Sequence, residues 1–280
     1  MIHGTRPARD LHKIRKYKHF GAINIPDFDL GQNLPLQDQN ASNAPYECVG
    51  YTAGHILSSI FNTPFSPDFS YAAARYIAGD GKEGSQGTSF HAGVDAIVAV
   101  GGLVKDMAKE TATSVGEATV SDWAFWTDIQ KRAALGRVQN GAKNVLGNGD
   151  AFNSILSACY QGGVPVSIGS PWFIEWESNI NNGVVGTPAL NGNYPSWHNY
   201  TVDGQKTING VPHLIVYSHQ GSRVGDGGKL YFPREAINAA ISVDGSGALA
   251  TDKNTIRWVY LLGMLTYRFP QLLNILPQLI

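Results

Sequence analysis

The chain has 280 residues, which is long enough for one large domain or two lobes around a substantial hydrophobic core. Its formal net charge is -1, so the chain has no overall positive field that would draw it to nucleic acid or to anionic membranes. Two cysteines exclude a disulfide-stapled fold, and the low share of charged residues, 15%, favours a surface of neutral polar groups.

Residues 1–22 form a predicted basic N-terminal arm. The segment is charged throughout and lacks the apolar core of a secretory signal, so we expect cytoplasmic synthesis without general export. Two interpretations are open, a solvated arm or an arm that docks on an acidic protein partner. The segment before Ile23 is short for an inhibitory prodomain, so we expect no zymogen control. The basic residues are Arg6, Arg9, Lys13, Arg15, Lys16 and Lys18, against the single acid Asp10.

Five helices are predicted between residues 48 and 162. From Cys48 the run CVGYTAGHILSSIF is apolar on most faces, which predicts a buried central helix. Ser66, Pro67 and Asp68 supply an N-cap, a first-turn proline and an acid, which predicts a second helix ending at Gly79. The other three are expected from Thr88 or Ser89 to Gly101, from Ser121 and Asp122 to Gly136, and from Asn148 or Asp150 to Gly162.

After Val164 the sequence predicts an antiparallel meander of short strands. The runs VPVSIG, HNYTVDG, VPHLIVYS and GKLYF are β-branched or aromatic and are separated by turn residues. Pro233 begins a further predicted helix, and TIRWVYLL near residue 260 predicts a last strand. The expected class is α+β, with a helical lobe of about 48–160, a sheet lobe of about 23–47 plus 161–262, and the first helix at the seam.

Residues 263–280 form a predicted apolar C-terminal tail. Arg257, Arg268, Pro270 and Pro277 interrupt the apolar run from residue 255 onward, so we expect no transmembrane segment. Leucines in the tail fall on one face of a short helix, which makes the tail, like the basic arm 6–18, a candidate docking element for protein partners.

Cys48 is the candidate nucleophile of the chain. A helix N-terminus lowers the pKa of a thiol, and a nearby histidine can take its proton. Gln39, in the polar loop before the helix, carries a carboxamide that can donate to an oxyanion beside the backbone N–H of Cys48. His198, at the start of a predicted strand, is the candidate proton acceptor. The alternative is that Cys48 and His198 are structural core residues, as we expect for Cys159, His55, His91 and His213.

Five segments in order resemble the papain-like (C1) cysteine peptidases, in particular bacterial and viral members, and cover residues 23–262. They are DQNASNAPYECVGYTAGHI, SPDFSYAAAR, GSQGTSFHAGVDAIVAVGGLV, GDAFNSILSACYQGGVPVSIG and IVYSHQGSRVGDGGKLYFPREAI. The resemblance implies a two-lobe fold in which the helical lobe packs against an antiparallel, barrel-like sheet. It also implies Cys48 as nucleophile, His198 as general base and then acid, and Gln39 as oxyanion donor.

The resemblance implies further site residues and also marks departures from the family pattern. Gly87 and Thr88 are placed on the wall of the substrate cleft, and Trp197 is expected to narrow the cleft or to pack over His198. Ser218 stands where the family has an asparagine, and its hydroxyl is expected to accept from the histidine ring. Gln220 replaces the tryptophan that shields this bond. If the hairpin shifts by one residue, His219 or Gln220 takes the place of Ser218.

The sequence therefore predicts a cysteine hydrolase that cleaves peptide or amide bonds through a Cys-His dyad and a thioester. One alternative is a weak or inactive papain-fold component of a larger assembly, for example a virion. A further alternative is a peptidoglycan amidase or endopeptidase. No cofactor is expected, and no metal either, because His213 and His219 have no cysteine or acid beside them to complete a zinc site.

Overall fold

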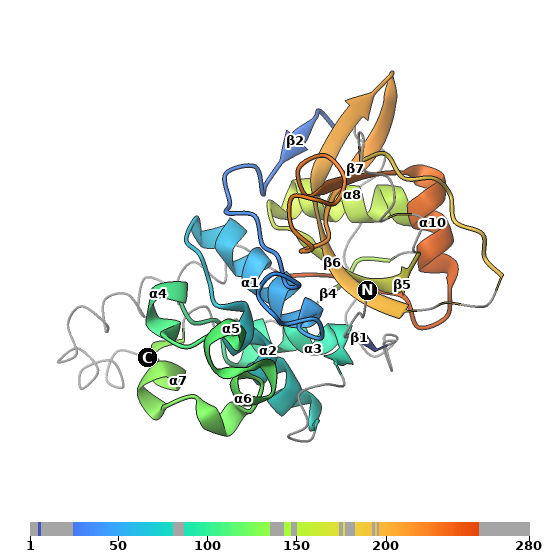
Figure 1. The fold of residues 1–280 in the computed structure, drawn as a ribbon. Coiled ribbons are helices and arrows are strands. Elements are labelled where there is room, and N and C mark those ends of the chain that lie inside the picture. The colour runs from blue at the N-terminus through green and yellow to red at the C-terminus, as the bar shows by residue number, and fades with distance from the viewer. Residues whose placement is uncertain are drawn as a thin grey trace.

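The computed structural model places a helical lobe beside an antiparallel sheet, with helix α1 between them (Figure 1). It describes residues 5–6, 25–80, 87–134, 143–146, 150–173, 176, 183–191, 194 and 196–251. The tail 263–280, the strand expected near residue 260 and most of the arm 1–22 lie outside the described residues. Within the described ranges, no helix is long and apolar enough to cross a membrane.

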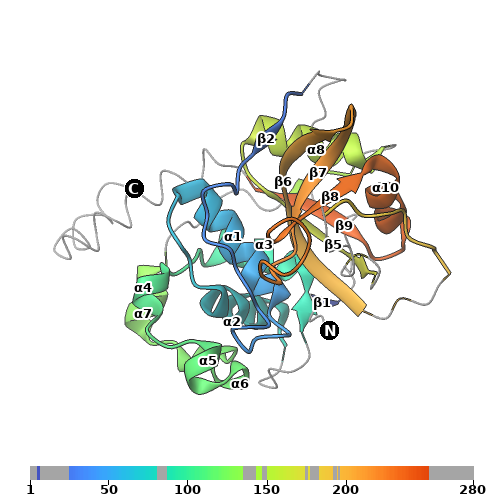
Figure 2. The ribbon, with the colours of Figure 1, turned by 45° about the horizontal axis from the view of Figure 1, so that its top comes forward.

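Three long helices form the centre of the helical lobe, as predicted. They are α1 (Cys48–Phe61), α2 (Pro67–Ala78) and α3 (Phe90–Ala99). Most of α1 is buried, because helices cover it on one side and the sheet on the other (Figure 2). The predicted cap of α2 is confirmed: the Ser66 hydroxyl accepts from the Phe69 amide at 3.2 Å, and Gly79 ends the helix in the left-handed conformation.

The rest of this lobe is built from short turns of helix. They are α4 (Lys105–Ala108), α5 (Ala112–Val115), α6 (Glu117–Val120), a 3-10 helix (Trp123–Phe125) and α7 (Asp128–Ala133). The single helix predicted from Ser121 to Gly136 is wrong. Trp126 is extended and buried, and its indole N–H donates to the Val120 carbonyl at 2.9 Å. Thr127 then starts α7 with its own capping box, so the chain turns where a continuous helix was expected.

The sheet has seven strands and is open. Its order is β4-β9-β5-β6-β7-β8, with β2 paired to β6 outside that path. The predicted meander is confirmed as β5 to β8, whereas the barrel-like closure is not found, because β4 and β8 are the two ends of the path. The strands are β2 (Phe28–Asp29), β4 (Lys143–Asn144), β5 (Val166–Trp172), β6 (Ser196–Ile208), β7 (Val211–Tyr217), β8 (Lys229–Pro233) and β9 (Gly247–Ala250).

Two further helices, α8 (Ala151–Gly162) and α10 (Arg234–Ser242), pack on the sheet (Figures 1 and 2). Apolar side chains of α8, among them Phe152 and Ile155, share one core with the sheet. Asp150 joins the two helices, because its carboxylate accepts from the Phe152 amide and from the Asn238 carboxamide. The expected helical lobe of about 48–160 includes most of α8, whereas these contacts join α8 to the sheet.

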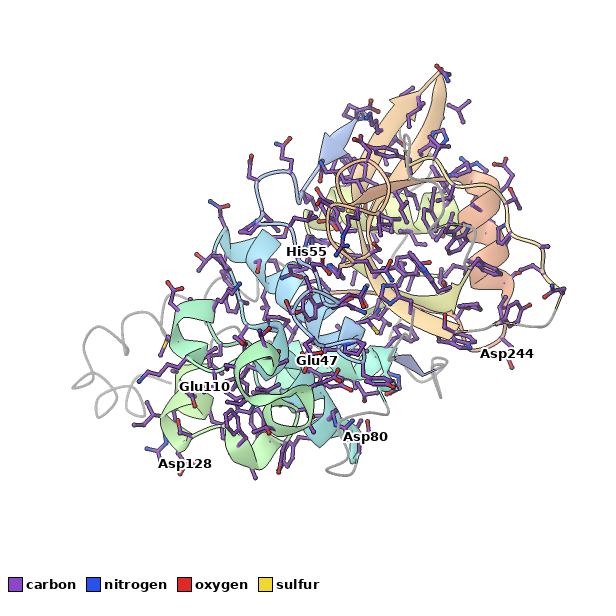
Figure 3. All side chains as sticks on the ribbon, in the orientation of Figure 1. Glu47, His55, Asp80, Glu110, Asp128 and Asp244 are labelled. Atoms are coloured by element: carbon purple, nitrogen blue, oxygen red, sulfur yellow. The ribbon has the colours of Figure 1, made fainter. Side chains whose placement is uncertain are left out.

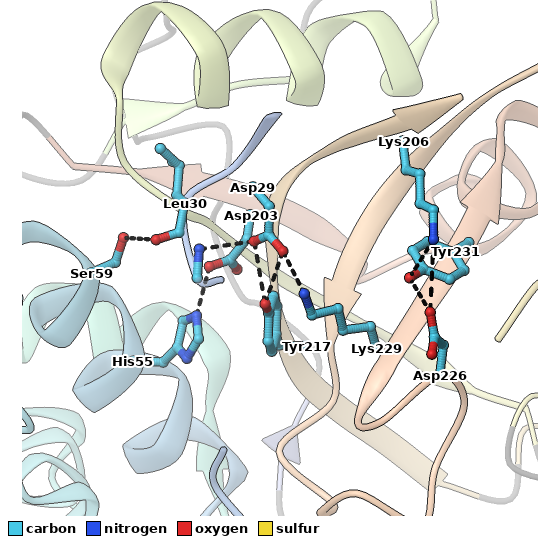
Figure 4. Close-up of polar contacts among 11 residues, drawn as sticks. Asp29, Leu30, His55, Ser59, Asp203, Lys206, Tyr217, Asp226, Lys229 and Tyr231 are labelled. Atoms are coloured by element: carbon cyan, nitrogen blue, oxygen red, sulfur yellow. Dashed lines mark hydrogen bonds and ion pairs between the residues drawn. The ribbon is translucent and has the colours of Figure 1, made fainter. Parts of the chain in front are cut away.

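Polar contacts fix α1 against the sheet (Figure 4). His55 of α1 and Asp203 of β6 are both buried, and their Nε2 and Oδ2 atoms are 2.6 Å apart. Nearby, the carboxylate of Asp29 accepts from the Tyr217 hydroxyl and from Lys229 Nζ, at 2.7 Å for the lysine. A buried carboxylate requires such donors, so His55 and Asp203 set the register between helix and strand.

Candidate active site

Cys48 is the first residue of α1 and has no exposed surface. The residue before it, Glu47, is the N-cap and makes no side-chain hydrogen bond to the first turn of the helix. The preceding loop is tightly folded: Asp38 Oδ1 accepts from the Asn40 and Ala41 amides, and Gln39 is fully buried. The Gln39 carboxamide donates to the Pro45 carbonyl only at the long distance of 3.4 Å.

His198 lies near the start of β6, and its ring has one fixed orientation. Its Nε2 is 2.7 Å from the backbone carbonyl oxygen of Ser218, and both residues are fully buried. Because a carbonyl oxygen only accepts, Nε2 carries the proton of this bond. The Ser218 hydroxyl was expected to accept this bond, and that is corrected: the main chain accepts, because β7 ends at Tyr217 and passes Ser218 beside β6.

An aromatic ring that the sequence analysis missed packs on His198. The ring centroids of Trp172 and His198 are 4.7 Å apart in an edge-to-face arrangement, and Trp172 is almost fully buried. Trp172 lies on β5, where Ser170 is opposite His198, so the two rings are diagonal neighbours on one face. Trp197 precedes His198 in the same strand and therefore points to the other face. Trp197 was expected either to narrow the cleft or to pack over His198, and it is Trp172 that packs on His198.

The first turn of α3 contacts the residue after Cys48 and, in the sheet, strand β5. Gly93 of α3 is packed against Val49, where an added Cβ would come within 2.7 Å of Val49 Cγ1. Three residues earlier, Phe90 packs against Gly169 of β5, which pairs with Asn199. Side chains three apart in a helix are about 5–6 Å from each other. Helix α3 therefore packs against both α1 and β5, where the two lobes join.

Gly87 and Thr88, the expected cleft wall, are buried, and Gly87 has a φ of 63°. Thr88 and Ser89 form strand β3, and β1 (Thr5–Arg6) pairs with it in parallel. Strand β1 also contacts β6, the strand that carries His198. We expected no inhibitory segment before Ile23. That expectation stays a prediction; strand β1 of the arm lies against the expected cleft wall at Thr88 and against the strand that carries His198.

Buried acids surround the chain just before Cys48. Figure 3 shows Glu47 near the start of α1, on the side of the helical lobe. Burial, and next the charge of Asp68, raise the pKa of Glu47 well above its usual value. The charges of Glu47 and Asp68 repel each other, so the buried pair keeps one proton between its two carboxyls. Burial also raises the pKa of Glu117 to about 7, although its Oε1 accepts from the Tyr46 amide at 2.8 Å.

This cluster predicts a pH-dependent stability that Glu47→Gln removes. The folded pKa of Glu47 lies above its unfolded value, so its stabilising contribution is complete below about pH 4.5 and is lost as pH rises through the folded pKa. A glutamine has no proton to lose, so it places no buried charge beside Asp68 at any pH. We expect the variant to melt at a higher temperature than the wild type at pH 8 and to differ little at pH 5.

Thermal unfolding at both pH values tests this prediction, with Asp244→Asn as the control. Asp244 is exposed, so the same change from carboxyl to carboxamide removes a charge without touching the buried cluster. Equal pH dependence of melting in Glu47→Gln and the wild type would contradict the assignment of the shared proton.

The fold is that of known cysteine proteases. Xylellain, a cysteine protease from Xylella fastidiosa, aligns with 89% of this chain and 96% of its own, at 17% identity and a TM-score of 0.67. A procathepsin B from Trypanosoma congolense aligns with 89% of this chain and 87% of its own, at 14% identity and a TM-score of 0.63. Bromelain from Ananas comosus, solved with the E64 inhibitor, aligns with 81% and 99%, at 16% identity and a TM-score of 0.55.

By sequence alone, neither a family model nor a curated protein matches the chain. The likeness to solved structures extends over most of the chain, and at these low identities it shows the fold alone. In this chain the helical lobe and the antiparallel sheet meet along α1, and the alignments extend over both. The chain therefore has the two-lobe fold of the papain-like cysteine proteases.

Proposed function

We propose that this protein is a cysteine hydrolase that cleaves peptide or amide bonds with Cys48 and His198 as a dyad. The observation that carries the proposal is the bond from His198 Nε2 to the Ser218 carbonyl, at 2.7 Å. It leaves Nδ1 as the basic atom of His198, whose strand β6 packs against α1, the helix that starts with Cys48. The thiol at that helix start is then the group for this base to activate.

In the proposed reaction His198 Nδ1 takes the proton of the Cys48 thiol, and the thiolate attacks the carbonyl carbon of the substrate. The Cys48 amide and the Gln39 carboxamide donate to the oxyanion. The imidazolium then gives its proton to the leaving amine as the carbon–nitrogen bond breaks, which leaves a thioester. Water, deprotonated by the same histidine, hydrolyses the thioester and restores the thiol. Because the bond from Gln39 to Pro45 is long, the carboxamide is free to exchange that partner for the oxyanion.

The Ser218 carbonyl takes the orienting role in this scheme. An acceptor that faces a developing imidazolium forms a stronger, charge-assisted bond, so the carbonyl stabilises the ion pair of thiolate and imidazolium. Trp172 contacts the same ring and excludes water from one side of it. We assign Gly87 and Thr88 to the substrate-binding wall on the other side of the cleft. We also assign Trp197, near the start of β6, to substrate binding.

One observation favours the alternative of an inactive, structural component. Cys48 and His198 are both fully buried, and a catalytic thiol must reach its substrate. Strand β1 lies against β3 and β6, so displacement of this segment is the movement that would expose the cleft. The alternative and the hydrolase therefore differ in one measurable property, the reactivity of Cys48.

Site-resolved alkylation tests the proposal, with Cys159 as a control thiol in the same chain. Burial raises the pKa of Cys159 well above its usual value, and its Sγ lies 3.5 Å from the Val202 carbonyl in the core. We expect iodoacetamide at pH 6 to label Cys48 faster than a free thiol in solution and to leave Cys159 unlabelled, as measured by mass spectrometry of the digested protein. Slow labelling of Cys48 at pH 6, with an alkylation rate that rises only near pH 8.5 as for an ordinary thiol, would favour the structural component.

A further inference from the structure

We propose that His219 is a positioning residue that holds the general base and the oxyanion loop in one arrangement, through the main chain around it. This inference rests on the proposed hydrolase function and goes beyond it, because His219 has no part in the reaction scheme. The residue follows Ser218 and lies at the turn that leads out of β7.

A four-residue segment, 218–221, contacts both halves of the proposed site. Its first carbonyl, of Ser218, accepts from His198 Nε2 at 2.7 Å, and its second, of His219, accepts from the Gln39 amide at 2.9 Å. Gln220 forms an antiparallel bridge with Asp38, and the Gly221 amide donates to the Gln37 carbonyl at 3.1 Å. We call this segment the backbone clamp. Its position decides where His198 and Gln39 lie relative to each other.

The clamp depends on an uncommon backbone conformation at His219. Its φ is 60°, in the left-handed region that residues with a Cβ seldom adopt outside turns. This conformation directs the carbonyls of Ser218 and His219 to two different partners, His198 on β6 and Gln39 on the loop. Glycine and asparagine tolerate this region best, so a histidine here requires surroundings that hold it.

Contacts of the His219 ring stabilise this backbone conformation. It is buried, with its centroid 5.1 Å from that of His55 and 6.5 Å from that of Tyr51, both on α1. His55 is itself fixed by Asp203. Burial, followed by the charges of His55 and His198, lowers the pKa of His219 well below its usual value, so the ring is neutral. The ring therefore anchors the clamp to α1, the helix that begins at Cys48.

Two substitutions separate the backbone from the ring. His219→Asn removes the ring but keeps a residue that readily adopts the left-handed conformation. His219→Ala also removes the ring, and it leaves a residue that adopts this conformation only with strain. We expect His219→Ala to lower kcat on a peptide substrate about tenfold more than His219→Asn, with KM changed little in either, because the alanine must bear the left-handed strain. Asn209→Ala is the matched control, since Asn209 has a φ of 51° in an exposed turn of the β6–β7 hairpin. The control is expected to lose stability and to keep kcat.

A second readout does not depend on activity. The Gln39 amide is protected by its bond to the His219 carbonyl, so His219→Ala should speed its hydrogen exchange at least tenfold more than Asn209→Ala does. Unchanged exchange at Gln39 in a folded His219→Ala protein would overturn the clamp, and so would a kcat of His219→Ala equal to that of the wild type. Failure of the hydrolase proposal is seen separately, as ordinary alkylation of Cys48 in the wild type.

Discussion

His198→Ala is expected to reduce kcat/KM by about 10³-fold or more, while Ser218→Ala leaves it within about threefold of the wild type. The first change removes the only base in the proposed scheme. The second removes a buried hydroxyl that has no hydrogen-bond partner among the described residues, and it leaves in place the carbonyl that accepts from His198. The pair of variants thus distinguishes a main-chain orienting group from a side-chain one.

The measurement is steady-state hydrolysis of a fluorogenic peptide, with the pH profile of Cys48 alkylation as the second readout. His198→Ala should also slow alkylation at pH 6, because the thiolate loses its imidazolium partner. Ser218→Ala should leave the alkylation profile unchanged. A loss of activity in Ser218→Ala comparable to that in His198→Ala would show that the hydroxyl, not the carbonyl, orients the histidine.

Removal of residues 1–22 is expected to accelerate Cys48 alkylation and peptide hydrolysis about tenfold or more. Thr5 and Arg6 pair with Thr88 and Ser89, at the wall to which we assign the substrate. Backbone hydrogen bonds of about 1 kcal/mol each can hold such a strand in place most of the time. A substrate must then compete with a strand of the same chain.

A variant that keeps the chain length controls for the loss of the whole arm. Thr5→Pro with Arg6→Pro removes both backbone donors of β1 and keeps the basic residues of the arm other than Arg6. It should reproduce most of the acceleration. Identical alkylation rates in the wild type, the truncated protein and the double proline variant would show that β1 does not obstruct Cys48.

Secondary structure was predictable where the signal was local. The cap at Ser66 and the apolar run after Cys48 predicted α2 and α1, because caps and burial patterns act within a few residues. The short helices α4 to α6 have four residues each, too few to show a period. Strand β9 reads GALA, without the β-branched residues that indicate strands, and only its pairing with β5 makes it one.

Contacts within the candidate site were less predictable than its residue types. The resemblance to a family proposes Cys48, His198 and Ser218 as site residues, but no sequence pattern says which atom of Ser218 faces the histidine. That depends on the path of the chain as it leaves β7. Trp172 contacts His198 from a neighbouring strand, and the pairing of β1 with β3 joins segments far apart in the chain. Such long-range neighbours follow from strand order and register.

The use of a main-chain acceptor at Ser218 also bears on how related genes are to be recognised. Every amino acid supplies a carbonyl, so the codon for residue 218 can vary among descendants without loss of the acceptor, provided that the turn is kept. A search that demands asparagine at this place would discard such genes as degenerate, although their products would retain an oriented histidine.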